Sequence, residues 1–148
     1  MAESKALEGL QQRLGEKIRD IEEKNERRIY VKLFEADLPD AARLLLDCGG
    51  RLAIITGIDT RNGIELLYHF FFAEEHRFIT VKVMARKPQP RMVSLATWLP
   101  AANWGEREIQ DLLGVTFDNH PDPRRLLLAD SWPEGVHPLR RDFRGLPE

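Results

Sequence analysis

Glu106, Arg107, Glu108 and Asp111 place four charged side chains within one short stretch. If this stretch is helical, Glu108 and Asp111 are three residues apart and share a face with Trp104. Paired carboxylates can act as general acid and base when burial separates their pKa values. A capping Glu106 and a charged helix face explain the same spacing, so the pattern does not by itself predict catalysis.

His120, flanked by Asp118 and Asp122, and His137 could supply metal ligands, since imidazole and carboxylate both bind metals. Both histidines precede proline in proline-rich chain, and neither HxxxH nor HxH spacing occurs. The single cysteine, Cys48, rules out a site built from several thiolates. We therefore predict no metal and no cofactor in this chain, with a small metalloenzyme using His120 and His137 as a remote alternative.

Two arginine pairs, Arg124-Arg125 and Arg140-Arg141, could bind phosphate or nucleic acid. Nearby carboxylates dilute them, and the formal net charge of the chain is −2. The planar guanidinium is better matched to carboxylates of a protein partner. A nucleic-acid-binding module is thus a second remote alternative, and no nucleotide-binding loop or nucleophile motif supports another enzyme class.

The chain has 148 residues, 43% of them hydrophobic and 31% charged, which is ordinary for a globular protein with a core. Its charged N-terminus is unlike a signal peptide, and no apolar run approaches the length of a membrane span. We therefore expect any membrane association to be indirect, through a partner.

Leucines at i, i+3 and i+7 predict a first helix over residues 3–15. Two segments follow, over residues 18–23 and 28–34, with a polar turn between them. Alternating apolar residues predict that the second is a half-buried strand. One continuous helix over residues 3–28 is the alternative.

Asp37 is a candidate N-cap for a second helix, with Pro39 in its first turn and Gly49-Gly50 at its end. The predicted buried stripe of this helix consists of Ala41, Leu44, Leu45 and Cys48. Three further strands with short connections are predicted over residues 51–58, 64–73 and 77–85.

A third helical region is predicted from Ser94, interrupted by Pro100. Its second piece covers residues 104–113, with Asn103 and Glu106 placed as a capping box and Gly114 as the stop. The sequence thus predicts an α+β domain over residues 1–118, with helices packed on a mainly antiparallel sheet of about four to five strands.

Residues 119–148, which we call the arm, show no helical or strand period. Five of these residues are proline and five are arginine, while Trp132 and Phe143 provide spaced apolar anchors. We interpret the arm as an extended segment that binds a partner. In the isolated chain we expect about its last 25 residues to be mobile or held by a neighbouring copy.

Residues 106–127 read Glu-Arg-Glu, two residues, Asp-Leu-Leu, six residues, His120, three residues, Arg124, one residue, Leu-Leu. This pattern resembles the signature of the 30 kDa subunit family of respiratory complex I, the C subunits of NADH-quinone oxidoreductase. The run His137-Pro-Leu-Arg-Arg-Asp-Phe143 resembles the family's next block. The resemblance is strong over residues 98–143 and covers nearly the whole chain in outline.

The resemblance implies a structural subunit without a redox cofactor, which docks on the large 49 kDa-type subunit beside an iron–sulfur subunit. It places the chain in the peripheral arm of a membrane-bound complex, on the cytoplasmic side, near the site of quinone reduction. The same module occurs in group 4 [NiFe] hydrogenases and in formate hydrogenlyase, where the hydrogenase large subunit is the partner. Iron–sulfur clusters or a nickel–iron site are then expected in the partner subunits.

Two features resemble the hydrogenase branch more closely: few residues follow Phe143, and Val136 separates Gly135 from His137. Both branches stay open on the sequence. In either branch, the resemblance implies that Glu106, Arg107, Glu108 and Asp111 pin the arm and meet the partner. The full set of predicted partner-interface residues is Trp104, Glu106, Arg107, Glu108, Asp111, His120, Arg124, Arg125, Trp132, His137, Pro138, Arg140, Arg141, Asp142 and Phe143.

Overall fold

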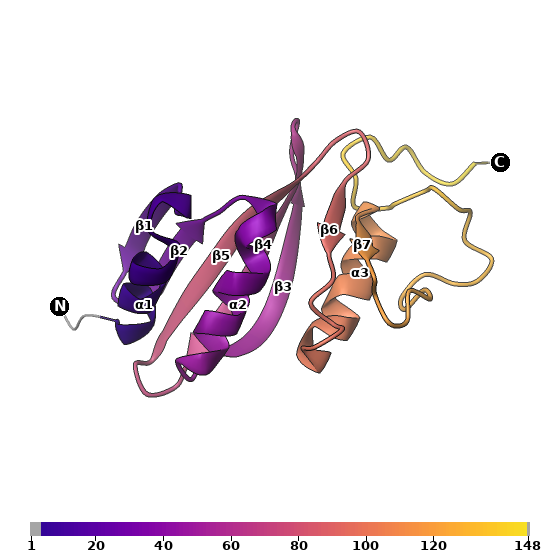
Figure 1. Ribbon diagram of the computed structural model, residues 1–148. Coiled ribbons are helices and arrows are strands. Elements are labelled where there is room, and N and C mark those ends of the chain that lie inside the picture. The colour runs from indigo at the N-terminus through magenta and orange to yellow at the C-terminus, as the bar shows by residue number, and fades with distance from the viewer. Residues whose placement is uncertain (1–3, 148) are drawn as a thin grey trace. The chain divides into compact units, whose positions relative to one another are not determined.

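The computed structural model describes residues 4–147 as a mixture of helices and strands (Figure 1). In chain order its helices and strands are α1 (Lys5–Leu14), β1 (Asp20–Asn25), β2 (Arg28–Lys32), α2 (Leu38–Asp47), β3 (Arg51–Asp59), β4 (Gly63–Phe72), β5 (Arg77–Arg86), β6 (Arg91–Val93), α3 (Asn103–Leu113) and β7 (Thr116–Asp118). Short 3₁₀ turns occupy Gly15–Lys17, Glu35–Asp37 and Pro100–Ala102.

Five strands form one sheet in the order β1-β2-β5-β4-β3. β1 pairs with β2 in antiparallel orientation, and β2 pairs with β5 in parallel. β5, β4 and β3 are sheet neighbours joined by short turns, the arrangement of antiparallel hairpins. The α+β class and the mainly antiparallel sheet predicted from sequence are therefore confirmed.

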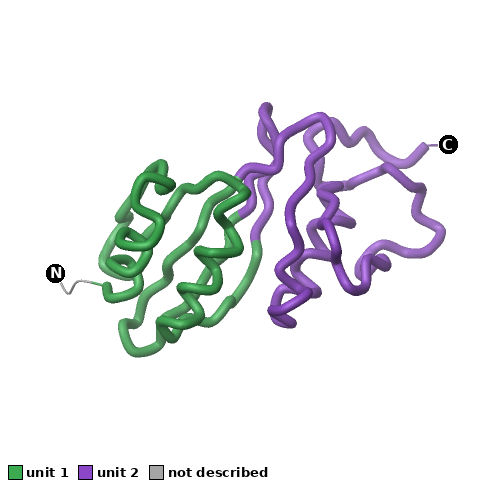
Figure 2. Tube along the Cα trace, viewed as in Figure 1, with its two compact units in different colours: residues 1–55, 67–83 green, residues 56–66, 84–148 purple. Residues whose placement is uncertain are grey.

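The chain divides into two compact units, residues 1–55 with 67–83 and residues 56–66 with 84–148 (Figure 2). The second unit contains α3, the two-stranded parallel sheet of β6 and β7, and the arm. No helix or strand follows Asp118 in the described part of the arm. The predicted boundary after residue 118 thus marks a change of secondary structure, whereas the compact units divide the chain elsewhere.

In the first unit, α1 and α2 contact each other and bury the leucine stripe that predicts α1. Gly15, with φ +40°, ends α1, and the chain then enters β1, so the alternative of one continuous helix is wrong. The predicted stripe of α2 is correct for Ala41 and Leu45, which are buried. Cys48 is exposed, because it lies beyond the last turn of α2, and its place in the predicted stripe is wrong.

Both predicted N-caps are wrong for one physical reason. Each helix is entered from a 3₁₀ turn, so Asp37 and Asn103 already have helical backbone angles. A capping side chain requires an extended residue at the N-cap, and neither residue caps its helix. Asp37 instead lies 3.6 Å from the Lys17 ammonium.

The region from Ser94 to Leu99 forms a single turn rather than the predicted first helical piece. The second piece and its Gly114 stop, with φ +76°, are confirmed. The three-residue strands β6 and β7 show no alternation that the sequence could reveal, and an ion pair between Arg91 and Asp118 joins them. Within residues 4–147, no helix is both long and apolar enough to cross a bilayer.

Two glycine substitutions should have opposite effects on stability. A Cβ at Gly63 would lie 2.3 Å from the Ala85 carbonyl oxygen and 2.9 Å from Arg86 Cα, which are backbone atoms that cannot turn aside. We expect Gly63→Ala to lower the free energy of unfolding by about 1–3 kcal/mol. A Cβ at Gly9 in α1 would meet only side-chain atoms at 3.6 Å and 3.8 Å, so Gly9→Ala should raise it by roughly 0.5–1 kcal/mol. Urea unfolding measures both, and a shift of the same sign for the two variants would contradict this packing.

Candidate functional site

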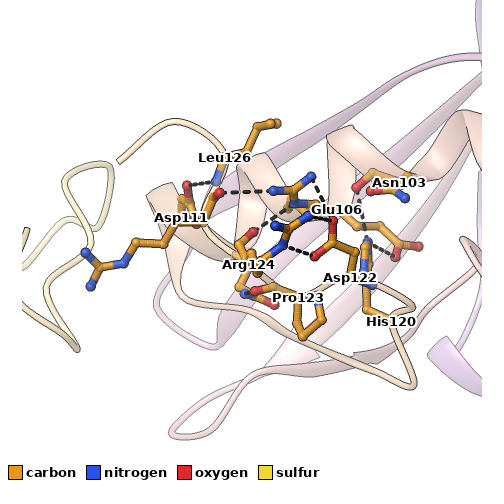
Figure 3. A network of polar contacts seen from close by, with 11 residues as sticks. Asn103, Glu106, Asp111, His120, Asp122, Pro123, Arg124 and Leu126 are labelled. Atoms are coloured by element: carbon orange, nitrogen blue, oxygen red, sulfur yellow. Dashed lines mark hydrogen bonds and ion pairs between the residues drawn. The ribbon is translucent and has the colours of Figure 1, made fainter. Parts of the chain in front are cut away.

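Asp111, on α3, binds the backbone of the arm. Its side chain is buried, and Oδ2 accepts hydrogen bonds from the N–H groups of Leu126 (2.9 Å), Leu127 (2.9 Å) and Leu128 (3.2 Å). Figure 3 shows the first of these bonds. Hydrogen bonds to an ionised acceptor are stronger than neutral ones. One carboxylate therefore fixes a turn of chain that has no regular backbone pairing.

Arg107 and Gln110 hold the segment just before that turn. Arg107 Nε donates to the Arg124 carbonyl (2.8 Å) and its Nη2 to the Arg125 carbonyl (3.0 Å). Gln110 Nε2 donates to the Pro123 carbonyl (2.9 Å). Side chains spaced three and four residues apart on α3 thus bind carbonyls and amides along residues 123–128.

The arginine pair of the arm is largely used within the arm. Arg124 binds both carboxylate oxygens of Asp122, at 2.7 and 2.9 Å, and holds the pKa of Asp122 well below its usual range. Arg125 Nη1 donates to the carbonyls of Trp132 (2.6 Å) and Ala129 (2.8 Å). The guanidinium of Arg125 therefore closes a loop of the arm.

His120 is buried where the arm leaves β7 (Figure 3). Its Nδ1 accepts the N–H of Asp122 (2.9 Å), so the proton of the neutral ring lies on Nε2, which donates to the Asn103 carbonyl (3.2 Å). Both ring nitrogens are thus engaged. Nε2 also lies 3.7 Å from Glu106 Oε2.

Glu106 is fully buried beneath the start of α3. Its carboxylate accepts the Ser94 hydroxyl (2.6 Å) and the Leu95 N–H (2.7 Å), so it fixes the turn after β6 rather than capping its own helix. Burial raises the pKa of Glu106 to about 7, although hydrogen bonds from Ser94, Leu95 and Ala96 act in the opposite direction. The carboxyl group is a structural, proton-sensitive element.

Residues 137–143 of the arm bind the C-terminal end of α3, where the last backbone carbonyls have no hydrogen-bond partner within the helix. His137 Nδ1 donates a hydrogen bond to the Asp111 carbonyl (2.9 Å), and the Leu139 N–H donates to the Leu112 carbonyl (3.0 Å). Arg140 Nη1 donates to the Leu113 carbonyl (3.2 Å). The His137 ring packs against Gly114, where a Cβ would lie 2.5 Å from His137 Cδ2. This contact and the positive φ together favour glycine at position 114.

Asp59, at the end of β3, holds the arm from another element. Its Oδ2 accepts the Arg141 N–H (2.7 Å), and Oδ1 lies 2.6 Å from the Lys87 ammonium. Burial raises the pKa of Asp59, but these two partners outweigh burial and leave the pKa below its ordinary value. Sequence reasoning missed Asp59 and Lys87, because no spacing links them to the arm.

The three tryptophan and phenylalanine side chains predicted at the interface differ in exposure. Trp132 and Phe143 stack on each other, with ring centroids 6.3 Å apart, and the Trp132 indole donates to the Val136 carbonyl (2.8 Å). Trp104 on α3 is 69% exposed. The predicted anchors of the arm are therefore partly used internally, whereas Trp104 is open.

The structure brings most of the predicted residues together on α3 and the arm, but not all of them. Asp111 is buried and Glu108 is exposed, so the two carboxylates predicted to share a helix face with Trp104 have different surroundings. Asp142 and the Arg141 side chain are exposed, and Pro138 is half-buried beside His137. Residues 123–128 and 137–141 are hydrogen-bonded within their own unit. That the last 25 or so residues of the isolated chain are mobile or held by a neighbouring copy stays a prediction.

Such an arrangement fixes the backbone of the arm and of the turn after β6. Among residues 4–147, no group of three His, Cys, Asp or Glu side chains is placed to hold a metal ion. The carboxylates of Glu106 and Asp111 accept hydrogen bonds from backbone N–H groups and from a hydroxyl group inside the fold. The network is thus a clamp, formed by α3 and Asp59, around an irregular segment.

Residues 31–147 match the family described as Respiratory-chain NADH dehydrogenase, 30 Kd subunit. The chain belongs to this family. The resemblance stated from residues 106–127 and 137–143 is confirmed, and the residues that carry it are those that clamp the arm.

Relatives come from two kinds of complex. The chain is 40% identical over 119 residues to hydrogenase-4 component G of Escherichia coli K12, covering 75% of this chain and 21% of that protein. It is 45% identical over 100 residues to the NADH-quinone oxidoreductase C subunit of Methylobacterium sp. 4-46, covering 65% of this chain and 45% of that protein. It is 39% identical over 77 residues to the NADH-quinone oxidoreductase C/D subunit of Methylococcus capsulatus Bath, covering 52% of this chain and 13% of that protein. The chain thus spans less than half the length of each of these three relatives.

A solved structure of the membrane-bound sulfane sulfur reductase, an archaeal respiratory membrane complex, contains a similar chain. Its TM-score is 0.82 at 25% identity, covering 95% of this chain and 86% of that one. The coverage includes most of the arm, so the fold with its irregular C-terminal segment recurs in a chain of a large assembly.

Removing the Asp111 carboxylate should release the arm locally. In Asp111→Ala, three N–H groups lose a charged acceptor, each bond being worth on the order of 1–3 kcal/mol. We expect amide hydrogen exchange at residues 126–128 to accelerate at least about tenfold. Glu108→Ala, on the exposed face of the same helix, is the matched control. Unchanged protection in Asp111→Ala would show that the clamp does not hold the arm.

Stability should fall with rising pH because of Glu106. Its folded-state pKa of about 7 lies above the ordinary 4.5, so the folded protein keeps a proton that the unfolded chain releases. The contribution of this proton to the free energy of unfolding is fully present below pH 4.5. It is lost as the pH rises to 7, which lowers the free energy of unfolding by roughly 3 kcal/mol. Urea unfolding at pH 5 and pH 7.5 should show this loss in the wild type and in Glu108→Gln, and not in Glu106→Gln. The same slope in all three proteins would exclude Glu106 as its source.

Proposed function

We propose that this chain is a non-catalytic docking subunit of a complex-I-like oxidoreductase, and that it carries no cofactor of its own. Its partner is the large 49 kDa-type subunit, with an iron–sulfur subunit beside it. The metal centres belong to those partners, and the complex is attached to the cytoplasmic side of the membrane. The chain positions and stabilises its neighbours rather than carrying electrons.

One observation carries this proposal: the charged and histidine side chains that could have been catalytic bind groups of their own chain. Arg107 and Asp111 bind arm backbone, Glu106 binds a turn, and His137 closes α3. No side chain in this group is left poised toward a substrate. A segment fixed in irregular form with exposed apolar side chains, such as Leu127 and Leu139 (56% and 59% exposed), is suited to contact another protein.

The lengths of the relatives support the choice of partner. The match covers 13% of the C/D protein of Methylococcus capsulatus and 21% of hydrogenase-4 component G. In these proteins the corresponding region is therefore joined to a much longer polypeptide. A domain covalently joined to another is held at high effective concentration beside it, which favours a direct contact between the two. We infer that the separate chain contacts the counterpart of that longer region.

A hydrogenase-type complex is the second candidate. The match to hydrogenase-4 component G extends over 119 residues and 75% of this chain, compared with 65% for the Methylobacterium protein. In that case the partner is a hydrogenase large subunit with a nickel–iron site. Hydrogenase genes beside the gene for this chain would select this branch, and quinone-reductase genes the other.

The contacts of the histidines and arginines favour the docking proposal over the two remote alternatives. Both ring nitrogens of His120 are engaged, and His137 Nδ1 binds a backbone carbonyl, so the two histidines do not form a ligand pair. Arg125 and Arg140 donate to carbonyls of their own chain, which removes them from a phosphate-binding stripe.

Copurification tests the proposal. A tagged chain expressed in its native cell should recover a large oxidoreductase subunit in near-stoichiometric amount, identified by mass spectrometry. The isolated chain should be colourless, without stoichiometric metal by elemental analysis. Recovery of the chain alone, one metal ion per chain, or turnover by the purified chain would each contradict the proposal.

A further inference from the structure

Trp104 is the most exposed of the large apolar side chains among residues 4–147, at 69%. It lies in the first turn of α3, and an exposed indole offers a large apolar area that a partner can bury. Trp132 does not present such an area, because it is half-buried and stacked on Phe143. Trp104 is therefore the aromatic side chain of this unit best placed to enter another molecule.

The same unit contains a hollow that is lined by Arg107, Arg124, Arg125 and Asp130. Arg107 is three residues from Trp104 on α3, so the two side chains are neighbours on the helix surface. Asp122, in contact with Arg124 and 3.6 Å from Arg107, adds a second carboxylate to this region. Three arginines and the carboxylates of Asp122 and Asp130 thus surround the hollow.

The arginines around the hollow differ in their freedom. Arg107 and Arg125 each donate to two or more carbonyls and are fixed in place. The side chain of Arg124 is 82% exposed and bound on one edge by Asp122. A planar guanidinium held in this way presents its remaining N–H groups outward, which suits a single carboxylate.

We infer that Trp104 and the arginine-lined hollow form the anchor of the partner interface, with the indole in an apolar recess and an Asp or Glu carboxylate of the partner subunit in the hollow. The inference rests on the proposed function and names the contact on which docking depends. Tryptophan and arginine are the residues most enriched among interface hot spots.

The charges around the anchor favour a protein over an anionic surface. Glu108 is exposed one turn after Trp104, and Asp122 and Asp130 flank the hollow. A membrane of anionic lipids or a nucleic acid would place many negative charges against these carboxylates. One carboxylate on an otherwise apolar partner surface can pair with the exposed edge of the Arg124 guanidinium without that repulsion.

Copurification of the whole complex with single variants tests the anchor. Trp104→Ala should reduce recovery of the partner subunit by about tenfold to thirtyfold, as expected for a hot spot. Ile54→Ala is the matched control, because Ile54 is similarly exposed (60%) and lies in the other compact unit. The control should recover the partner within about twofold of wild type. Thermal unfolding of the isolated Trp104→Ala chain should match wild type, because the indole is exposed.

A second pair of variants tests the carboxylate. Arg124→Gln should reduce recovery by roughly fivefold or more, and the wild-type interaction should weaken as salt is raised. Arg61→Gln, which changes another exposed arginine in the same unit, should have no effect.

The outcomes separate this inference from the proposed function. If wild type recovers the large subunit and Trp104→Ala recovers it equally well, the anchor is wrong while the docking function stands. If wild type recovers no large subunit, the proposed function fails and the anchor fails with it. If the isolated wild-type chain is a dimer in sedimentation and Trp104→Ala is a monomer, a second copy occupies the surface, which also overturns the inference.

Discussion

An irregular segment can be fixed only if its backbone polar groups find partners, and the second unit of this protein depends on that constraint. The arm contributes no helix or strand within the described residues, so its N–H and C=O groups cannot pair as regular elements do. Side chains on one face of α3 supply the missing hydrogen-bond partners. Asp111 accepts hydrogen bonds from three backbone amides, and Arg107 donates hydrogen bonds to two carbonyls. The helix therefore works as a template for the chain that follows it.

The same constraint explains why the charged residues resemble a reaction centre in the sequence. A carboxylate that must bind several amides and an arginine that must bind carbonyls have to be buried beside one another, as catalytic groups also are. Catalytic groups and backbone-binding groups share the same residue types and the same spacing in the sequence. Only the atoms to which their side chains are hydrogen-bonded distinguish the two roles. Here the partners are backbone groups of residues 95 and 124–128, so the density of charge reflects the demands of the arm.

Sequence reasoning was most accurate where one period dominates. The leucine stripe of α1, the alternation in β2 and the turn-bounded strands β3 to β5 follow from local side-chain spacing. It failed where a contact from elsewhere decides. Glu106 has the spacing of a capping residue, yet the 3₁₀ turn before α3 removes the cap, and the carboxylate binds the turn after β6. Asp59 is separated from Arg141 by most of the chain, so no local pattern could reveal that contact.

Relatives from hydrogenase and from quinone oxidoreductase complexes both match this chain, which limits where selectivity for a partner can lie. Bonds between α3 side chains and the arm backbone form within one polypeptide, and their energies do not depend on which complex surrounds it. Discrimination is a difference between two binding free energies, so it has to come from groups that meet the partner. In the anchor that we infer, such groups are the outward side chains of Trp104 and Arg124, while the clamp fixes the backbone of the arm.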